Sequence, residues 1–182
     1  MEALMQSLQS MGWATALRES ALAYPIILSL HLVGMGLFGG MIAMTDLRLL
    51  GVAFKGRTLA DVHGQLRAFK HLGLTMVVTC GALLASSKAG TYWPNPFFKL
   101  KLILLTLVGI HALVFRGSVY DNAAAIDQAN QISAKAKTAA VLSLILWTSI
   151  ACVGRGIGYI EPPLDKLHAA LSRSESIAGQ PK

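Results

Sequence analysis

Residues 21–44, ALAYPIILSLHLVGMGLFGGMIAM, decide the fold of this 182-residue chain. The stretch contains no Asp, Glu, Lys or Arg, and the side chain in it that titrates near neutral pH is His31. About 20 apolar residues are enough for a helix to cross the hydrocarbon core of a bilayer. An imidazole at that depth needs a partner inside the protein. The stretch therefore predicts a membrane-spanning helix with a candidate functional residue near its middle.

The composition of the whole chain is that of a membrane protein. Apolar residues make up 54% of the sequence and charged residues 14%, whereas a soluble domain is closer to one quarter charged. The net charge is +7, but no basic segment carries the interleaved aromatic residues of a nucleic-acid-binding protein. The Lys and Arg residues stand instead at the ends of apolar runs, where they anchor helices against lipid headgroups. We expect a lipid bilayer as the partner, and no nucleic acid.

Four apolar runs predict four membrane crossings joined by short connections. They lie at about residues 21–44, 71–90, 97–115 and 138–158. We therefore expect an all-α fold, an integral membrane antiparallel four-helix bundle with short interfacial helices at the termini. Residues 1–163 form the single transmembrane domain in this prediction, and residues 164–182 form a short surface helix and a flexible tail. In the first crossing, Gly36 and Gly40 make a Gly-x-x-x-Gly pair, which predicts close approach of another helix.

The orientation of the bundle is predicted from its basic residues. The positive-inside rule compares the Lys and Arg content of the loops on the two sides of the membrane. The two sides hold equal numbers here, but the charges are densest in the loop after the first crossing, over residues 46–70. We place this loop in the cytoplasm and the protein in a bacterial inner membrane. Both termini then lie on the periplasmic side.

Histidines at or within the crossings suggest a first functional hypothesis. The sequence contains no nucleophile–base motif, phosphate-binding loop or His-Glu-x-x-His pattern, so no catalytic residue is assigned. Facing imidazoles inside a helical bundle are the usual axial ligands of a membrane haem b. His31, His71 and His111 are therefore the candidate haem-binding and metal-ligating residues, and His71 and His111 differ in depth by about 6 Å. The candidates to hold the haem propionates are Arg48, Arg67 and Arg116 at one end of the bundle and Arg155, Lys101 and Arg18 at the other.

Two functional classes remain open. In the first, the protein is a haem-b electron-transfer protein, or the membrane anchor of a dehydrogenase, with a quinone or a redox protein as its partner. In the second, there is no cofactor: the bundle is an accessory subunit, or it handles a small molecule or ion at a polar site around His31. A copper-handling version would add Met35, Met41 and Met44, since thioethers suit Cu(I). The structural alternative is that each histidine simply hydrogen-bonds a neighbouring helix. A homo-oligomer and a subunit of a larger membrane complex both agree with these classes.

A set of short motifs is distributed over most of residues 13–160. They are Ser20, Tyr24-Pro25, His31-Leu-Val-Gly34, Asp46-Leu-Arg-Leu-Leu-Gly51, Asn95-Pro-Phe-Phe-Lys99 and Gly154-Arg155 to Tyr159. In these motifs the chain resembles an uncharacterised family of small four-helix bacterial inner-membrane proteins, whose best marker is His-x-x-Gly followed by Asp-Leu-Arg-Leu-Leu-Gly. The resemblance implies that the histidine at position 31 is the recurrent one. It shifts weight from the other two histidines to His31, Asp46, Arg48 and Arg155.

Overall fold

The computed structural model describes residues 1–120, 123–128 and 132–160. Four helices in this part of the chain are long and apolar enough to cross a membrane. They are α3 (Ala23–Leu49), α4 (Leu59–Ser87), α6 (Pro96–Phe115) and α8 (Ala134–Ile160). The shorter helices are α1 (Glu2–Gln9), α2 (Gly12–Glu19), α5 (Ala89–Tyr92), the π-helix η1 (Arg116–Tyr120) and α7 (Ala123–Gln128). The predicted all-α fold of four antiparallel apolar helices is confirmed.

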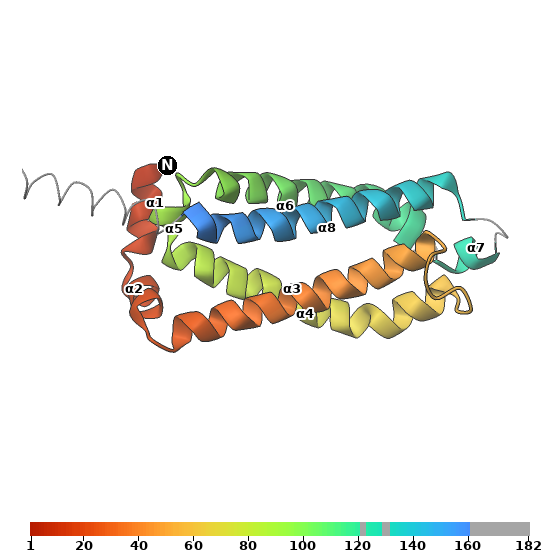
Figure 1. Ribbon diagram of the computed structural model, residues 1–182, viewed down its shortest axis with the longest axis horizontal. Coiled ribbons are helices and arrows are strands. Elements are labelled where there is room, and N and C mark those ends of the chain that lie inside the picture. Colours follow the sequence, from red (N-terminus) through yellow and green to blue (C-terminus); the bar gives the residue numbers. More distant parts are fainter. Residues whose placement is uncertain (121–122, 129–131, 161–182) are drawn as a thin grey trace, which may run out of the picture.

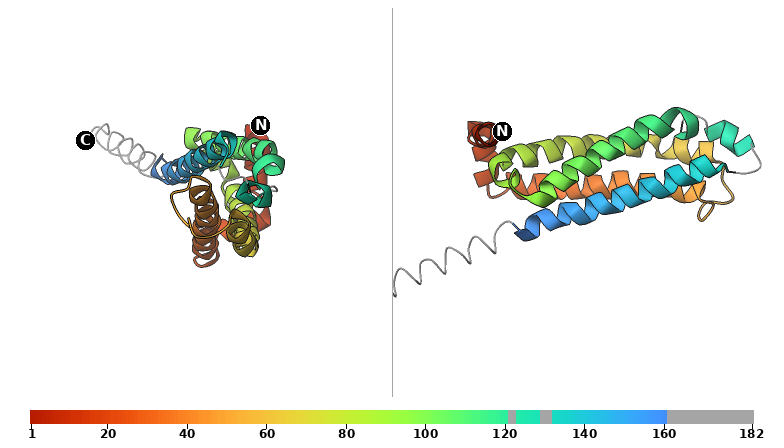
Figure 2. Two further views of the ribbon diagram at one scale, coloured as in Figure 1. Left: turned by 90° about the vertical axis from the view of Figure 1, so that its right-hand side faces the viewer. Right: turned by 90° about the horizontal axis from the view of Figure 1, so that it is seen from above.

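The four long helices are arranged as two pairs (Figure 1). Helix α3 packs against α4, α6 packs against α8, and contacts between α3 and α8 join the pairs. Helices α1 and α2 lie across one end of the bundle, here called the α1–α2 end, and α7 lies at the other. Figure 2 shows the same elongated bundle from one end and from above. The N-terminus and the last described turn of α8 lie at the same end, as four crossings require.

The helices extend beyond the apolar runs that predicted them. Helix α4 begins at Leu59, well before the crossing expected from residue 71, and α3 continues past residue 44 to Leu49. Their additional turns contain polar residues, so a hydropathy pattern alone does not include them. Two short helices, α1 and α2, stand in the N-terminal segment where one interfacial helix was expected. The surface helix and tail predicted over 164–182 lie outside the described residues.

Polar side chains mark the start of each long helix. Their oxygens accept hydrogen bonds from backbone N–H groups of the first helical turn, which have no partner within the helix. The bonds join Ser20 to Ala23 (3.0 Å), Thr58 to Asp61 (3.1 Å), Asn95 to Phe97 (2.9 Å) and Ser133 to Ala136 (3.2 Å). These caps set where each helix begins, and therefore which residues lie at membrane depth.

Glycines allow α3 and α4 to pack closely. A Cβ atom on Gly73 would lie 2.8 Å from the backbone nitrogen of Phe38, and one on Gly34 would lie 2.8 Å from the Cβ of Met76. Small residues at such a crossing let the backbones of membrane helices approach each other. A Cβ on Gly36 or Gly40 would meet nothing within 4 Å. Within the described chain, the close contact is therefore made by Gly34, on another face of α3, and by Gly73 of α4.

We expect Gly73→Ala to destabilise the bundle, because the added methyl group collides with the α3 backbone. Overpacking of this kind costs about 1–3 kcal/mol, which should appear as a lower melting temperature in mild detergent. Gly64→Ala is the matched control, since Gly64 lies on the same helix and a Cβ there meets nothing within 4 Å. Equal melting temperatures for the two variants would contradict this account of the packing.

Candidate functional site

His31 lies on α3 with its imidazole against α4. The residue is 8% exposed, and a Cβ atom on Gly81 would lie 2.9 Å from its Cε1 atom. The ring also lies near the backbone of Val77. Its Nδ1 atom is buried and has no hydrogen-bond partner among the described residues. A buried polar atom without a partner is costly, so His31 is the first candidate for contact with a ligand.

Lys101 reaches the same part of the bundle from α6. Its ammonium group interacts electrostatically with the His31 ring, and its Nζ atom lies 3.5 Å from the position of a Cβ on Gly154 of α8. In the part of the chain that the structure describes, Lys101 has no hydrogen bond or ion pair. Ionisable residues inside membrane helices are rare and mark binding sites and transport pathways. Lys101 is therefore the second candidate.

These residues lie at similar depths in the bundle. His31 is eight residues from the start of α3 and Lys101 five from the start of α6, which corresponds to about 12 Å and about 8 Å. Gly81 and Gly154 each lie six residues before the end of their helices, or about 9 Å. All of these helix ends belong to the α1–α2 end (Figure 1). We call the four residues, one from each long helix, the His31–Lys101 site.

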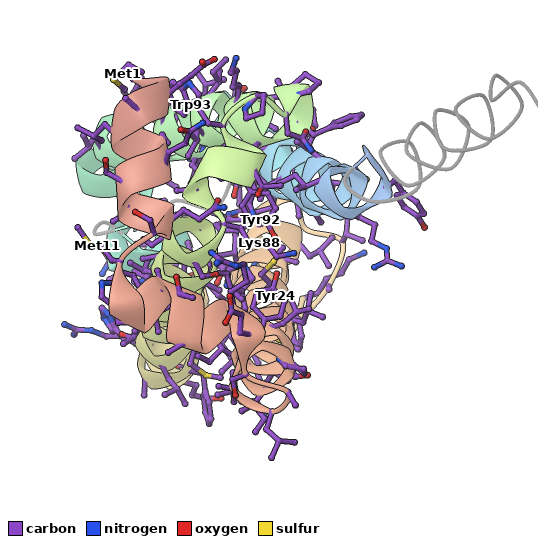
Figure 3. The ribbon with its side chains drawn as sticks, turned by 90° about the vertical axis from the view of Figure 1, so that its left-hand side faces the viewer. Met1, Met11, Tyr24, Lys88, Tyr92 and Trp93 are labelled. Carbon is purple, nitrogen blue, oxygen red and sulfur yellow. The ribbon has the colours of Figure 1, made fainter. Side chains whose placement is uncertain are left out.

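A cluster of one lysine and two tyrosines lies at the α1–α2 end (Figure 3). The hydroxyl groups of Tyr24 and Tyr92 are 3.2 Å apart. The Lys88 amine lies 5.0 Å from the ring centroid of Tyr24 and 5.8 Å from that of Tyr92. Arg18 donates a hydrogen bond of 3.0 Å to the carbonyl of Ser87, which ties α2 to the end of α4. The end of the bundle nearest the site is therefore basic and aromatic.

The structure does not bring His71 and His111 together. His111 is buried on α6 and donates from Nε2 to the carbonyl oxygen of Ala139 on α8, at 3.0 Å. His71 lies on α4 and is exposed on the outside of the bundle. A haem iron held by two histidines needs two ring nitrogens that face each other across the macrocycle. His31 packs against Gly81 instead, and the structure gives no evidence that the described histidines hold a haem b.

Arg48 belongs to the end of the bundle opposite the α1–α2 end. Its Nε atom donates to the carbonyl of Arg57 at 2.7 Å, and its guanidinium lies 3.8 Å from the Asp127 carboxylate. That carboxylate also accepts the N–H groups of Leu59 (2.7 Å) and Ala60 (2.9 Å) at the start of α4. Arg48 and Asp127 thus connect three loop and helix segments at this end. These contacts hold α3, α4 and α7 together, and we call them the Asp127 clasp.

The other polar residues predicted around His31 also lie apart from it. Asp46 is fully buried, 15 residues after His31 on the same helix, and this separation is about 22 Å along the helix axis. Its carboxylate interacts electrostatically with Lys70 of α4. Arg155 is exposed, and its guanidinium lies 5.3 Å from the ring centroid of Tyr159. Asp46 and Arg48 therefore do not form one site with His31, and Arg155, which follows Gly154 of the site, has an exposed side chain.

The described residues contain no group of three or more His, Cys, Asp or Glu side chains that could hold a metal ion. Methionine ligands are a separate case. Met35 and Met41 are partly buried on α3, whereas Met44 is exposed. A copper site built from His31 and all of these methionines stays a prediction.

Sequence reasoning considered Lys101 only as a contact for a haem propionate, and it did not identify Asp127. Lys101 lies near the start of an apolar run, where a lysine normally extends to the headgroups. The available signal was its position five residues inside α6. Asp127 lies in a polar segment with no motif around it, and its role depends on α7 approaching the start of α4. No sequence signal indicated that contact.

Comparison with known proteins gives a family but no described function. Residues 21–160 match the model of a family of unknown function (DUF6644). No curated protein and no solved structure matches the chain. The matched range contains all four long helices and the whole His31–Lys101 site, and it begins after α2.

Proposed function

The chain belongs to the DUF6644 family of unknown function, and we propose that it is a multi-pass membrane protein that binds a small polar molecule at the His31–Lys101 site. The observation that carries this proposal is the buried Nδ1 atom of His31, which has no hydrogen-bond partner among the described residues. The nearby ammonium of Lys101 adds a charge to the same position. The protein acts here through its own side chains, with no resident cofactor.

The energetics of the membrane interior support a ligand at this position. A polar group in hydrocarbon cannot be satisfied by bulk water, and an unsatisfied group costs several kcal/mol. This cost arises at His31, whose ring lies between α3 and α4, and Lys101 reaches a similar depth between α6 and α8. A bound molecule that hydrogen-bonds both side chains would offset it. Such an arrangement is expected of a binding site whose polar groups lower the stability of the protein when no ligand is bound.

We also propose an orientation for the site. The loop between α3 and α4, at the far end from α1 and α2, contains the densest group of Lys and Arg residues. The positive-inside rule assigns such a loop to the cytoplasm. In a bacterial inner membrane the α1–α2 end then faces the periplasm. A ligand would reach the His31–Lys101 site from the periplasm or from the outer leaflet.

A reduced-minus-oxidised visible spectrum separates this proposal from a haem-b redox role. We expect no α or Soret bands from protein purified in mild detergent out of cells supplied with haem. The reason is that the His111 ring is hydrogen-bonded to the Ala139 carbonyl and the His71 side chain is exposed on the outer surface of the bundle. Haem bands at one haem per chain would overturn the cofactor-free proposal.

Native mass spectrometry in mild detergent tests the binding site directly. We expect wild-type protein to retain one small molecule per chain, and His31→Ala to lose it, because the variant removes the buried Nδ1 acceptor. His71→Ala is the matched control, since His71 is an exposed histidine on a spanning helix, and it should retain the molecule. Equal retention by the two variants would contradict the proposal.

A further inference from the structure

The hydrogen-bonding character of the His31–Lys101 site indicates what it can bind. A neutral imidazole has one N–H donor and one acceptor nitrogen. Nδ1 of the His31 ring is buried and has no hydrogen-bond partner within the described chain. In the tautomer with the proton on Nε2, Nδ1 is an acceptor that needs a donor. Lys101 has the opposite need, because an ammonium group has three donors and no acceptor.

We propose that the site binds the carboxyl group of a monocarboxylic acid, an inference that rests on the function proposed above. The acid O–H donates to Nδ1 of His31, and the carbonyl oxygen of the same group accepts from the Lys101 ammonium. One carboxyl group thus satisfies both side chains at once. Transfer of the proton along the first hydrogen bond leaves a carboxylate between an imidazolium and an ammonium. The number of protons and the total charge are the same in both forms.

The charges around the site favour one negative charge. Lys101 is the cation that acts on His31, and one ammonium matches one carboxylate, whereas a phosphate monoester carries close to two charges at neutral pH. Basic residues at the α1–α2 end, Arg18 and Lys88, add a longer-range attraction for anions. The acidic residues described at this end are Glu2 and Glu19, and Glu19 lies 3.6 Å from Arg18. Neither lies on a spanning helix.

Apolar residues lie next to the site along its helices, as an apolar chain attached to the carboxyl group would require. On α4, Cys80 and Leu84 are buried on either side of Gly81. Between α6 and α8, the Phe97 ring lies 3.1 Å from the position of a Cβ on Gly156. The acid could come from two sources with the same carboxyl chemistry: a long-chain acid from the bilayer, or a short-chain acid from water that passes Tyr24, Lys88 and Tyr92.

Calorimetric titration of the full-length chain in lipid nanodiscs tests this inference, with dodecanoate and butanoate as probes and empty nanodiscs as the blank. We expect saturable binding of dodecanoate at one site per chain. Methyl dodecanoate should not bind, because the ester carries no negative charge for Lys101 and cannot take up a proton to form an O–H that donates to Nδ1. Binding of butanoate as well would identify an acid taken from water, and binding of dodecanoate alone would identify an acid taken from the bilayer.

Variants assign the binding to the two side chains. Lys101→Met keeps the apolar part of the side chain and removes the charge. We expect Lys101→Met and His31→Ala each to bind dodecanoate on the order of tenfold more weakly than the wild type. This is the loss expected for one charge-assisted hydrogen bond. Lys101→Arg should retain binding, which keeps the test open if the methionine variant does not fold. Lys99→Met is the matched control. Lys99 lies on the same helix as Lys101, but its ammonium group contacts another side chain, at 5.8 Å from the Trp93 ring centroid.

Two results would overturn the inference: binding of the methyl ester as tight as that of the acid, or wild-type affinity in Lys101→Met. If the chain retains another molecule through His31 but binds no carboxylate, the carboxyl assignment fails and the proposed function stands. If His31→Ala also retains that molecule, the proposed function fails as well.

Discussion

A polar group inside a bilayer has to be satisfied by the protein or by something that the protein binds, because no water is present to do so. Most of this bundle meets that constraint internally. His111 donates to the Ala139 carbonyl, Thr45 to that of Met41, and Ser87 to that of Leu84. His31 and Lys101 differ, since one has a buried nitrogen without a described partner and the other has a half-buried charge that interacts with the His31 ring. The proposed function follows from that difference.

The packing of the helices explains why the imidazole lies where it does. Gly34, Gly73 and Gly81 bring α3 and α4 so close that each would collide with its neighbour if it had a Cβ. The His31 ring occupies the space left at Gly81, on the face of α3 that points to α4. The same close approach that stabilises the pair therefore positions the ring. Helices α1 and α2 cover the end of the bundle nearest to it (Figure 3).

Hydropathy was sufficient to predict four long helices and their antiparallel order, because apolar length reports directly on membrane crossing. It did not predict where α4 begins, since the turns from Leu59 are polar and are fixed by the Thr58 cap and the Asp127 clasp. Spacing selected Gly36 and Gly40, but only packing shows which face of a helix is covered. His31 was found from its depth. Lys101 was predicted only as a propionate contact, because its electrostatic interaction with His31 joins two helices that lie far apart in the sequence.

The central claim is that Nδ1 of His31 is an acceptor that the described protein leaves open. Nitrogen-15 NMR of imidazole-labelled protein in nanodiscs tests it, with the His31 signals assigned by their loss in His31→Ala. The account predicts an Nε2–H tautomer for His31 and an Nδ1 signal that moves when dodecanoate is added, while the His111 signals stay in place. A proton already on Nδ1 in the ligand-free protein, or an Nδ1 signal that does not respond to the acid, would contradict it.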